Sequence, residues 1–556
     1  MEENRAYSEY DRYLSPLDVW AIAFGCAIGW GAFVMPGTTF LPLAGPLGTV
    51  IALLLGMALM LVIGMNFSFL MNRRPGTGGV YAYTKEVFGR EHAFLCAWFL
   101  ALSYLTILFM NATSLFLVIR MVFGRRLQIG YYYYNIAGNG IFLGEVGASI
   151  IALAGVGLLF INAKPLLQRV QTILAVALLS CVLVLAAVCL PHMKLSGMQG
   201  FGIQSGKFFG VISIVMLAPW AFVGFEVISL ETAHFDFKVR RSRWIVLASI
   251  LLCGLVYIAL TLVSVCAAPD GYASWPAYIA DLGQLDGIAA NPTFYAAKAI
   301  LGDFGLFLVA IAAMAAILTG IIAAYRATTR VLSTMAEDRI LSERFANTTY
   351  SILFIMVVSI LISIAGRSAL ESFIDLTSLG ATIGFAYTSA SAWKIARKTG
   401  RRAFMVTGAV GTIISVMFTI IQLIPRLAAL ETMSATAYMM LTIWCLLGFM
   451  FYLRTVARSS ATVYSGTSAS GVAMFALLLY SALMWLGKKL AAADSVATVQ
   501  STLRFEGTLM IVVIFIALGV MMYIQQLVRR KYEKLSEHGA PEPEVDEAEP
   551  EEEDAP

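Results

Sequence analysis

Two segments of this 556-residue chain combine residues that weaken a helix with groups that could bind a small polar molecule. In the first, Gly25, Gly29 and Gly31 cluster within the apolar run 17–40, and Pro36 follows them. Glycine and proline are poor helix formers, so this spacing predicts an unwound segment. Unwinding frees backbone N–H and C=O groups, and the N–H groups of the following half-helix suit a carboxylate. Close helix packing is the alternative, and it explains Gly25 and Gly29 better than Gly31 and Pro36.

The second segment adds an acid to the same pattern. Pro219 and Gly224 lie within the apolar run 209–235, and Glu226 follows Gly224 closely. A carboxylate inside a bilayer costs at least about 2.5–3.5 kcal/mol on insertion scales, so it normally faces a cavity or a partner. Glu226 could bind an amine, carry a proton or link the two weakened segments. Its structural alternative is a carboxylate that accepts hydrogen bonds from freed backbone N–H groups.

Two neighbours of Glu226 sharpen this interpretation. Glu231 lies five residues further on, about 140° around a regular helix, so the two acids are not expected to form one paired site. Trp220 precedes Glu226 by six residues. Its ring could cover a bound substrate or stack on a cationic group, and core packing is the alternative role.

The composition places both segments in a membrane. The chain is 59% hydrophobic and 13% charged, with a mean hydropathy of +0.80, whereas soluble domains carry about 25% charged residues. We expect an all-α integral membrane protein with about 14 transmembrane helices, since apolar runs of about 20 residues recur along the chain. These runs cover 17–40, 47–71, 93–123, 141–162, 170–191, 209–235, 244–267, 294–325, 349–366, 373–396, 403–425, 436–456, 468–487 and 507–528.

The distribution of basic residues predicts the orientation. With a cytoplasmic N-terminus, most of the 38 Lys and Arg residues fall in the segments that this count places inside, which is the positive-inside pattern. We therefore expect a multi-pass protein of the cell membrane with both termini cytoplasmic. The expected parts are a cytoplasmic N-terminus (1–16), a ten-span core (17–396), four further spans (397–528) and an acidic, disordered cytoplasmic tail (529–556).

Residues typical of enzymes and metal sites are missing from the sequence pattern. The seven cysteines all lie in predicted spans without a CxxC pair, and the four histidines are scattered. No HExxH, GxSxG or GxxxxGK[ST] motif occurs, so we expect neither catalysis nor ATP-driven transport. We expect membrane lipid as a partner, and we expect no metal, cofactor or nucleic acid.

Four landmarks together resemble a known family, the amino acid–polyamine–organocation permeases. The first span, with Ala32, Phe33, Pro36 and Gly37 after its glycines, resembles the family's opening motif. The segment 74–83 is similar to the family's loop after the second span. Trp220-x-Phe222-x-Gly224-x-Glu226 resembles its sixth span, and 333–338 the cytoplasmic end of its eighth.

This resemblance implies a fold and a site. The fold has two inverted five-span repeats, spans 1–5 and 6–10, with helices 1 and 6 discontinuous. The site lies between spans 1 and 6, bordered by spans 3, 8 and 10, and binds the carboxylate and amine of an amino acid largely through backbone atoms. The substrate-binding residues that it implies here are Ala27, Ile28, Gly29, Trp30, Gly31, Asn111, Trp220, Phe222, Val223, Gly224 and Glu226.

The expected function is therefore secondary active transport of an amino acid by alternating access. A polyamine or another organic amine is the alternative substrate, and a non-transporting amino acid sensor is the alternative role. Some proton-coupled members carry a lysine in the fifth span in the place of a sodium ion, and the matching segment 170–178 has none. The segment 236–243 also replaces the family's usual proline-rich loop. A coupling proton, a sodium ion and a counter-substrate all stay open, as does the oligomeric state.

Overall fold

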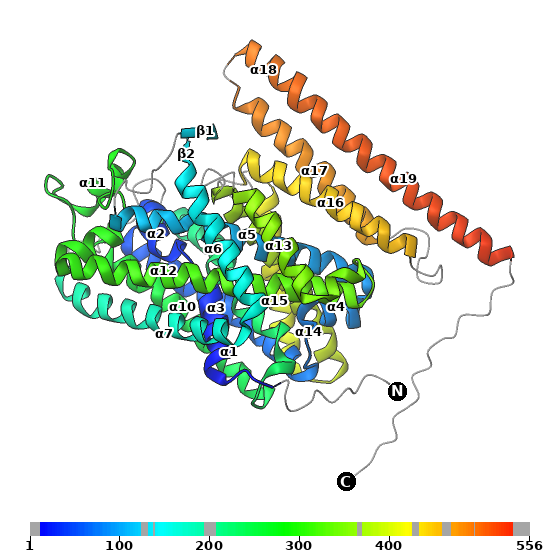
Figure 1. Cartoon of the computed structure of the whole chain (residues 1–556), viewed down its shortest axis with the longest axis horizontal. Coiled ribbons are helices and arrows are strands. Elements are labelled where there is room, and N and C mark those ends of the chain that lie inside the picture. The colour runs from blue at the N-terminus through cyan, green and yellow to red at the C-terminus, as the bar shows by residue number, and fades with distance from the viewer. Residues whose placement is uncertain are drawn as a thin grey trace, which may run out of the picture. The chain divides into compact units, whose positions relative to one another are not determined.

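The computed structural model describes residues 12–123, 132–136, 139–193, 207–363, 370–424, 433–458, 469–493 and 495–537. Almost all of these residues are helical (Figure 1). One small antiparallel hairpin, β1 (Tyr132–Ile136) and β2 (Asn139–Phe142), precedes α6. The chain divides into two compact units, Met1–Met440 and Leu441–Pro556. The prediction of an all-α membrane protein is therefore confirmed at the level of the fold class.

The first unit contains the α-helices up to α15 and the start of α16. Their bounds are α1 (Pro16–Ala27), α2 (Gly31–Met35), α3 (Leu41–Arg73), α4 (Gly79–Phe88), α5 (Arg90–Phe123), α6 (Leu143–Asn162), α7 (Lys164–Cys189), α8 (Lys207–Met216), α9 (Ala218–Phe222), α10 (Ser242–Val263), α11 (Trp275–Ala280), α12 (Pro292–Glu337), α13 (Thr348–Ser363), α14 (Leu370–Lys398), α15 (Arg402–Leu423) and α16 (Ala435–Arg458). Short 3₁₀ or π segments cover Pro36–Phe40, Leu190–His192, Phe225–Leu230, Thr232–His234, Val239–Arg241, Leu282–Gln284 and Glu343–Ala346.

The second unit holds the end of α16 and three further helices. These are α17 (Ala469–Ala491), α18 (Val496–Thr502) and α19 (Thr508–Glu537), with a π segment at Leu503–Gly507. An ion pair joins Lys489 Nζ to Glu506 Oε1 at 3.3 Å within this unit. Helix α19 continues past residue 528, where the last predicted span ends, and the rest of the acidic tail (538–556) lies outside the described residues.

Nine helices in the described part of the chain are long and apolar enough to cross a membrane. Pro16–Ala27, Val146–Asn162 and Thr348–Ile362 are apolar but shorter. Two of the runs in the fourteen-span prediction, 17–40 and 209–235, are broken into short helices, which is one reason why this length criterion finds fewer spans. The count of fourteen and the inverted repeat stay predictions.

A glycine on α1 lets this helix approach α12 closely. α12 packs against α5 and α7, and it also contacts α1 (Figure 1). A Cβ on Gly25 of α1 would lie 2.8 Å from Thr319 Cβ, so no larger residue fits there without a shift. Small residues serve this purpose in membrane helices. The packing role that the sequence allowed for Gly25 is therefore present.

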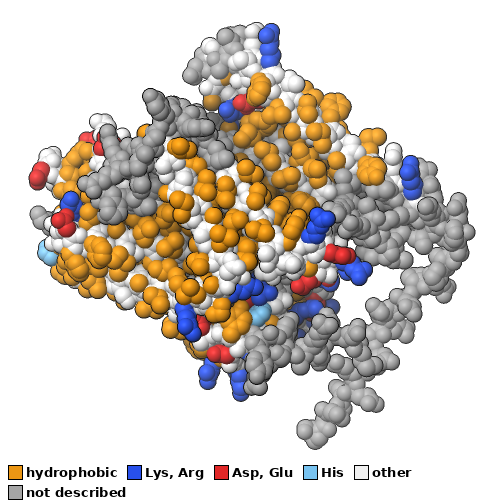
Figure 2. Space-filling view, viewed as in Figure 1, with side chains coloured by type: hydrophobic (Ala, Val, Ile, Leu, Met, Phe, Trp, Pro, Cys, Tyr) orange, Lys and Arg blue, Asp and Glu red, His pale blue; other side chains and the backbone are white. Residues whose placement is uncertain are grey.

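The face shown in Figure 2 is largely apolar, with charged side chains mainly toward its edges. Large hydrophobic side chains that a soluble protein would bury are exposed in this structure. On α7, for example, Ile173 is 66% exposed and Leu183 is 59% exposed. An apolar exterior of this kind fits a lipid environment, since extensive exposed apolar surface is rare on soluble monomers.

Candidate functional site

The first predicted break lies between α1 and α2. Ser15 and Asp18 form a capping box that starts α1, and the helix ends at Ala27. Ile28 then adopts an extended conformation (φ −104°, ψ 108°), and helical structure resumes at Gly31. Because α2 begins here, its first N–H groups have no carbonyl partner in their own helix. The unwinding predicted from the glycine spacing is present at Gly29.

The second predicted break follows α9. Val223 leaves the helix (φ −56°, ψ 136°), and Gly224 adopts φ +125°, a conformation that side chains rarely permit. The chain then continues as a 3₁₀ segment, Phe225–Leu230. A Cβ on Gly224 would lie 2.6 Å from the carbonyl carbon of Cys26 and 2.7 Å from the nitrogen of Ala27. The two breaks are therefore in direct backbone contact, although some 200 residues separate them in sequence.

Asn111 of α5 holds the first break in place. Its Oδ1 accepts a hydrogen bond from the backbone N–H of Trp30 at 3.4 Å, and its Nδ2 donates to the carbonyl of Ile107 at 2.9 Å. Cβ atoms on Gly29 and on Gly320 of α12 would each lie less than 3 Å from this amide. The predicted contribution of span 3 thus packs against spans 1 and 8 at the break.

A small cavity lies where the two breaks meet. Its volume is ≈ 20 Å³, little more than one water molecule needs. Seven of the eleven predicted site residues line it: Ala27, Gly29, Trp30, Gly31, Asn111, Trp220 and Val223. Sequence reasoning did not assign its other lining residues, which are Cys26, Ile107, Met110 and Tyr257. Among the described residues, no charged side chain lines this cavity.

The other four predicted residues lie beside the cavity without lining it. Ile28 is fully buried, and the ring of Phe222 packs 6.5 Å from that of Tyr257. Gly224 forms the backbone contact described above. The missed residues gave no chemical signal in the sequence, except that Ile107 precedes Asn111 by one helical turn.

Glu226 faces the second break and α5. Its carboxylate is buried and accepts hydrogen bonds from the Gly224 N–H at 2.8 Å and from the Tyr104 hydroxyl at 3.2 Å. These contacts are the ones that the structural alternative predicts, a carboxylate that satisfies a freed backbone N–H group. Glu226 therefore fixes the geometry of Gly224, which in turn contacts the first break.

The cavity offers donors that bonds within the protein do not use. The indole Nε1 of Trp30 is buried without a hydrogen-bond partner. Among the described residues, the carbonyls of Ala27, in the cavity wall, and of Ala221, next to the lining residue Trp220, accept only from the weak thiol donor of Cys253, at 3.8 and 3.5 Å. A free N–H donor near weakly bonded C=O acceptors can bind a carboxylate and an ammonium group. In the described residues no group of His, Cys, Asp and Glu could hold a metal ion.

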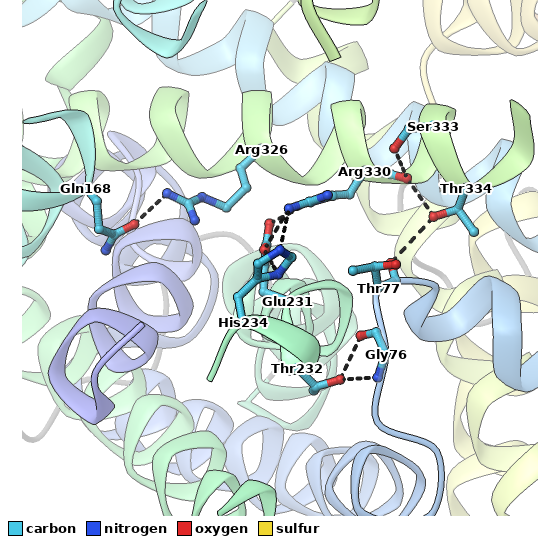
Figure 3. A network of polar contacts seen from close by, with 10 residues as sticks. All are labelled: Gly76, Thr77, Gln168, Glu231, Thr232, His234, Arg326, Arg330, Ser333 and Thr334. Atoms are coloured by element: carbon cyan, nitrogen blue, oxygen red, sulfur yellow. Dashed lines mark hydrogen bonds and ion pairs between the residues drawn. The ribbon is translucent and has the colours of Figure 1, made fainter. Parts of the chain in front are cut away.

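A separate polar network follows the second break (Figure 3). Arg330 of α12 donates from Nε to Glu231 Oε1 at 3.1 Å, and its terminal nitrogen lies 3.3 Å from His234 Nε2. Because a guanidinium only donates, Nε2 accepts, which leaves the proton on Nδ1, 3.1 Å from Glu231 Oε2. Glu226 and Glu231 thus lie in different environments, as their spacing predicted.

Backbone pairing ties neighbouring segments to this network. Leu14 forms a parallel bridge with Phe235, in which the Leu14 N–H donates to the His234 carbonyl at 3.0 Å. The Thr232 hydroxyl accepts from the Gly76 N–H and donates to the Gly76 carbonyl, both at 2.7 Å (Figure 3). Contacts among four segments therefore join this end of the first unit together.

The segment 74–90, which includes α4, is attached to the end of α12. Lys85 Nζ lies 2.7 Å from Asp338 Oδ1, and the Tyr81 hydroxyl donates to Oδ2 at 2.5 Å. Burial and this hydrogen bond raise the pKa of Tyr81 well above its usual range, so the hydroxyl keeps the proton that it donates. The loop that carried the family resemblance thus packs on α12 beside the polar network.

Comparison with known proteins gives consistent relatives. A branched-chain amino acid permease, BcaP of Bacillus subtilis, is 27% identical over 256 residues, 45% of this chain and 54% of its own length. The methylthioribose transporter of the same organism is 25% identical over 342 residues (60% and 69%). Cationic amino acid transporter 4 of Mus musculus is 22% identical over 406 residues (70% and 61%). The chain thus spans about half the length of the first of these relatives.

The amino acid permease family profile matches residues 14–451, which include both helix breaks, the cavity and the polar network. The match covers well over half of the chain and the four landmarks recognised in the sequence. This chain belongs to the amino acid permease family of the amino acid–polyamine–organocation superfamily.

Proposed function

We propose that the chain is a secondary active transporter that carries a neutral amino acid with an apolar side chain by alternating access. The ten-span core (17–396) performs the transport in a cell membrane, with both termini cytoplasmic. The observation that carries this proposal is the backbone contact between Gly224 and Cys26–Ala27. It joins two helix breaks at one cavity, and paired broken helices are the mark of a transporter's substrate site.

The substrate's amino acid head group is assigned to the backbone of the breaks. The N–H of Gly31 at the start of α2 and the indole N–H of Trp30 suit the carboxylate. The carbonyls of Ala27 and Ala221, which face only the Cys253 thiol, suit the ammonium group. These groups recognise what all amino acids share and leave selection to the side-chain surroundings.

The side-chain surroundings favour a neutral, apolar substrate. Ile107, Met110, Val223 and Tyr257 line the cavity, and Glu226 is turned toward Gly224 and Tyr104. A cationic side chain or a polyamine would enter this space without a carboxylate to pair with, which is unfavourable in a low-dielectric site. A branched or aromatic side chain would instead gain from apolar contact.

Transport requires the site to open, because ≈ 20 Å³ cannot hold an amino acid. The small size of the cavity supports a cycle in which the site opens when the contacts between α12 and the residues around Glu231 separate. The ion pair of Arg330 with Glu231 then acts as a closure that re-forms after release.

Counterflow in proteoliposomes tests the proposal. Vesicles loaded with unlabelled leucine should accumulate radiolabelled leucine, isoleucine and phenylalanine, and external arginine, putrescine and methylthioribose should compete poorly. Accumulation of putrescine or arginine instead would refute the assignment of an apolar side chain. Leucine binding, measured by a thermal shift, without any counterflow would favour a sensor over a transporter.

A further inference from the structure

A second, much larger cavity lies beside the polar network and shares no lining residue with the break cavity. Its volume is ≈ 520 Å³, within the range of small-molecule sites. Its walls come from the start of α1, from α6, α7 and α12, and from the segment after the second break. Its charged lining residues are Asp18, Lys164, Arg169, Glu231, Arg326 and Arg330.

The acids of this cavity already have partners. Glu231 pairs with Arg330. Asp18 accepts hydrogen bonds from the Thr172 hydroxyl at 2.6 Å, from Ser15 Oγ at 2.7 Å and from Gln168 Nε2 at 3.4 Å. Its oxygens are therefore largely occupied by neutral donors.

Three cations of the cavity form no close ion pair, and the charge of Glu231 acts on Arg326 only from beyond ion-pair distance. In the part of the chain that the structure describes, no carboxylate lies within 4.0 Å of the charged groups of Lys164, Arg169 or Arg326. Lys164 and Arg169 are exposed, and water can solvate them. Arg326 is the exception, because its side chain is buried in the cavity wall.

Arg326 carries a buried charge whose hydrogen bonds are incomplete. It is 6% exposed, it donates to Gln168 Oε1 at 2.5 Å (Figure 3), and its guanidinium lies 5.8 Å from the Phe160 ring centroid. Its Nε is buried without a partner, and so is the neighbouring hydroxyl of Thr329, which also lines the cavity. Buried charges are normally paired, because an uncompensated one is strongly unfavourable.

We propose that this basic cavity binds an anion that carries a carboxylate or phosphate group, separately from the transported substrate. Arg326 holds the anion through the planar donor fork that suits both groups. Lys164 and Arg169 attract it at the mouth, and the Thr329 hydroxyl donates a further hydrogen bond. Because the site joins α7 to α12, its occupant stabilises the arrangement in which the Glu231–Arg330 pair is closed.

The anion could be free in solution or could be a lipid headgroup, so the test has two arms. The full-length protein is purified in an uncharged detergent, and its melting temperature is followed during titration with sodium phosphate or sodium succinate. Sodium chloride keeps the ionic strength constant. In the second arm the protein is placed in nanodiscs of phosphatidylcholine with or without phosphatidylglycerol. Neither arm contains an amino acid, so the result is independent of the proposed transport function.

The variants decide whether the cavity is responsible. We expect a saturable rise in melting temperature whose apparent Kd weakens about tenfold or more in Arg326→Gln, since a hydrogen-bonded charge is lost. Lys164→Gln, at the exposed mouth, should weaken binding without a folding defect. Lys398→Gln removes an exposed positive charge outside the cavity and is the matched control.

Each outcome has a definite meaning. Saturable stabilisation by phosphate or succinate in detergent supports a free anion. Stabilisation only by phosphatidylglycerol supports a headgroup, provided that Lys164→Gln or Arg326→Gln removes it. The absence of stabilisation in both arms overturns the proposal, and so does stabilisation that neither variant weakens more than Lys398→Gln does.

Discussion

Gly31 and Trp220 lie in direct contact, and the glycine is what permits it. A Cβ on Gly31 would lie 2.3 Å from Cη2 of Trp220 and 2.6 Å from Cζ2. The tryptophan is 7% exposed and reaches from α9 over the start of α2. The helix break thus leaves room for an aromatic ring that closes the cavity.

Gly31→Ala should therefore displace Trp220 and abolish most of the uptake. We expect at least a tenfold lower initial rate in proteoliposomes, with the protein still inserted and monodisperse. Gly155→Ala in α6 is the matched control, because its Cβ would meet nothing within 4 Å. The double variant Gly31→Ala/Trp220→Phe has a smaller ring at position 220. It should therefore recover part of the melting temperature that Gly31→Ala loses. Normal uptake by Gly31→Ala would argue against the closing role of Trp220.

Gly224→Ala tests the contact between the breaks. Its φ of +125° strains any side chain, by about 1–3 kcal/mol, and its Cβ would also collide with the backbone of Cys26. Gly400 has φ +67° but open space around it, so Gly400→Ala carries the strain without the collision. We expect Gly224→Ala to lose uptake and several degrees of melting temperature, and Gly400→Ala to keep its uptake. Equal behaviour of the two variants would mean that contact between the breaks is unimportant.

Glycine and proline spacing was enough to predict both helix breaks, whereas the residues that line the cavity were assigned through the family resemblance. The reason is physical, since a broken helix requires special residues whose positions are visible in a sequence. Ile107, Met110 and Tyr257 could not be found in this way. They are ordinary apolar residues of long helices, and only the packing of α5 and α10 brings them to the cavity.

The contacts of Glu226 could not be predicted from the sequence either. Its position in an apolar run indicated a partner or a cavity, and either would satisfy a buried carboxylate equally well. The orientation of the side chain depends on the turn at Gly224, which converts the helix into a 3₁₀ segment and points the acid at Tyr104. Arg326 was visible only as a positive-inside charge, because its burial arises from the packing of α12.

Glu226→Gln should destabilise the protein more than it changes substrate affinity. The amide nitrogen cannot accept a hydrogen bond, so one donor, Gly224 N–H or Tyr104 Oη–H, loses its acceptor, at about 1.5–3 kcal/mol. Tyr104→Phe removes one of the two contacts, and the pair should be non-additive in melting temperature. The check is the leucine affinity together with uptake as a function of pH. A shifted pH profile in Glu226→Gln but not in Tyr104→Phe would instead assign a coupling proton to Glu226.

Gln171 predicts transport that does not depend on sodium. Its amide Nε2 lies 3.4 Å from the Ala21 carbonyl and 3.5 Å from that of Thr319, between α1 and α12. The buried amide of Gln171 therefore already donates to two carbonyl groups that a sodium ion bound here would need as ligands. Replacing external sodium by choline should leave uptake unchanged within about twofold, whereas Gln171→Ala should lower it by leaving both carbonyls without this donor. A strict sodium requirement in the unaltered protein would contradict this prediction.

Removing the partner of Glu231 should open the closed end of the first unit. Glu231 is 1% exposed and Arg330 29%, so Arg330→Gln removes the ion-pair partner of a buried carboxylate and leaves it His234 and the more distant charge of Arg326, at a cost of about 1–3 kcal/mol. The double variant Glu231→Gln/Arg330→Gln restores a neutral pair and should melt above Arg330→Gln alone. The exposed pair Arg74–Glu86, 2.7 Å apart, is the control, because exposed pairs contribute about 0–1 kcal/mol.

Access is measured as the rate at which a membrane-impermeant maleimide labels Thr329→Cys, which lines the basic cavity. Faster labelling in Arg330→Gln, but not in Arg74→Gln, is the expected result. Unchanged labelling would mean that this ion pair does not hold the end closed.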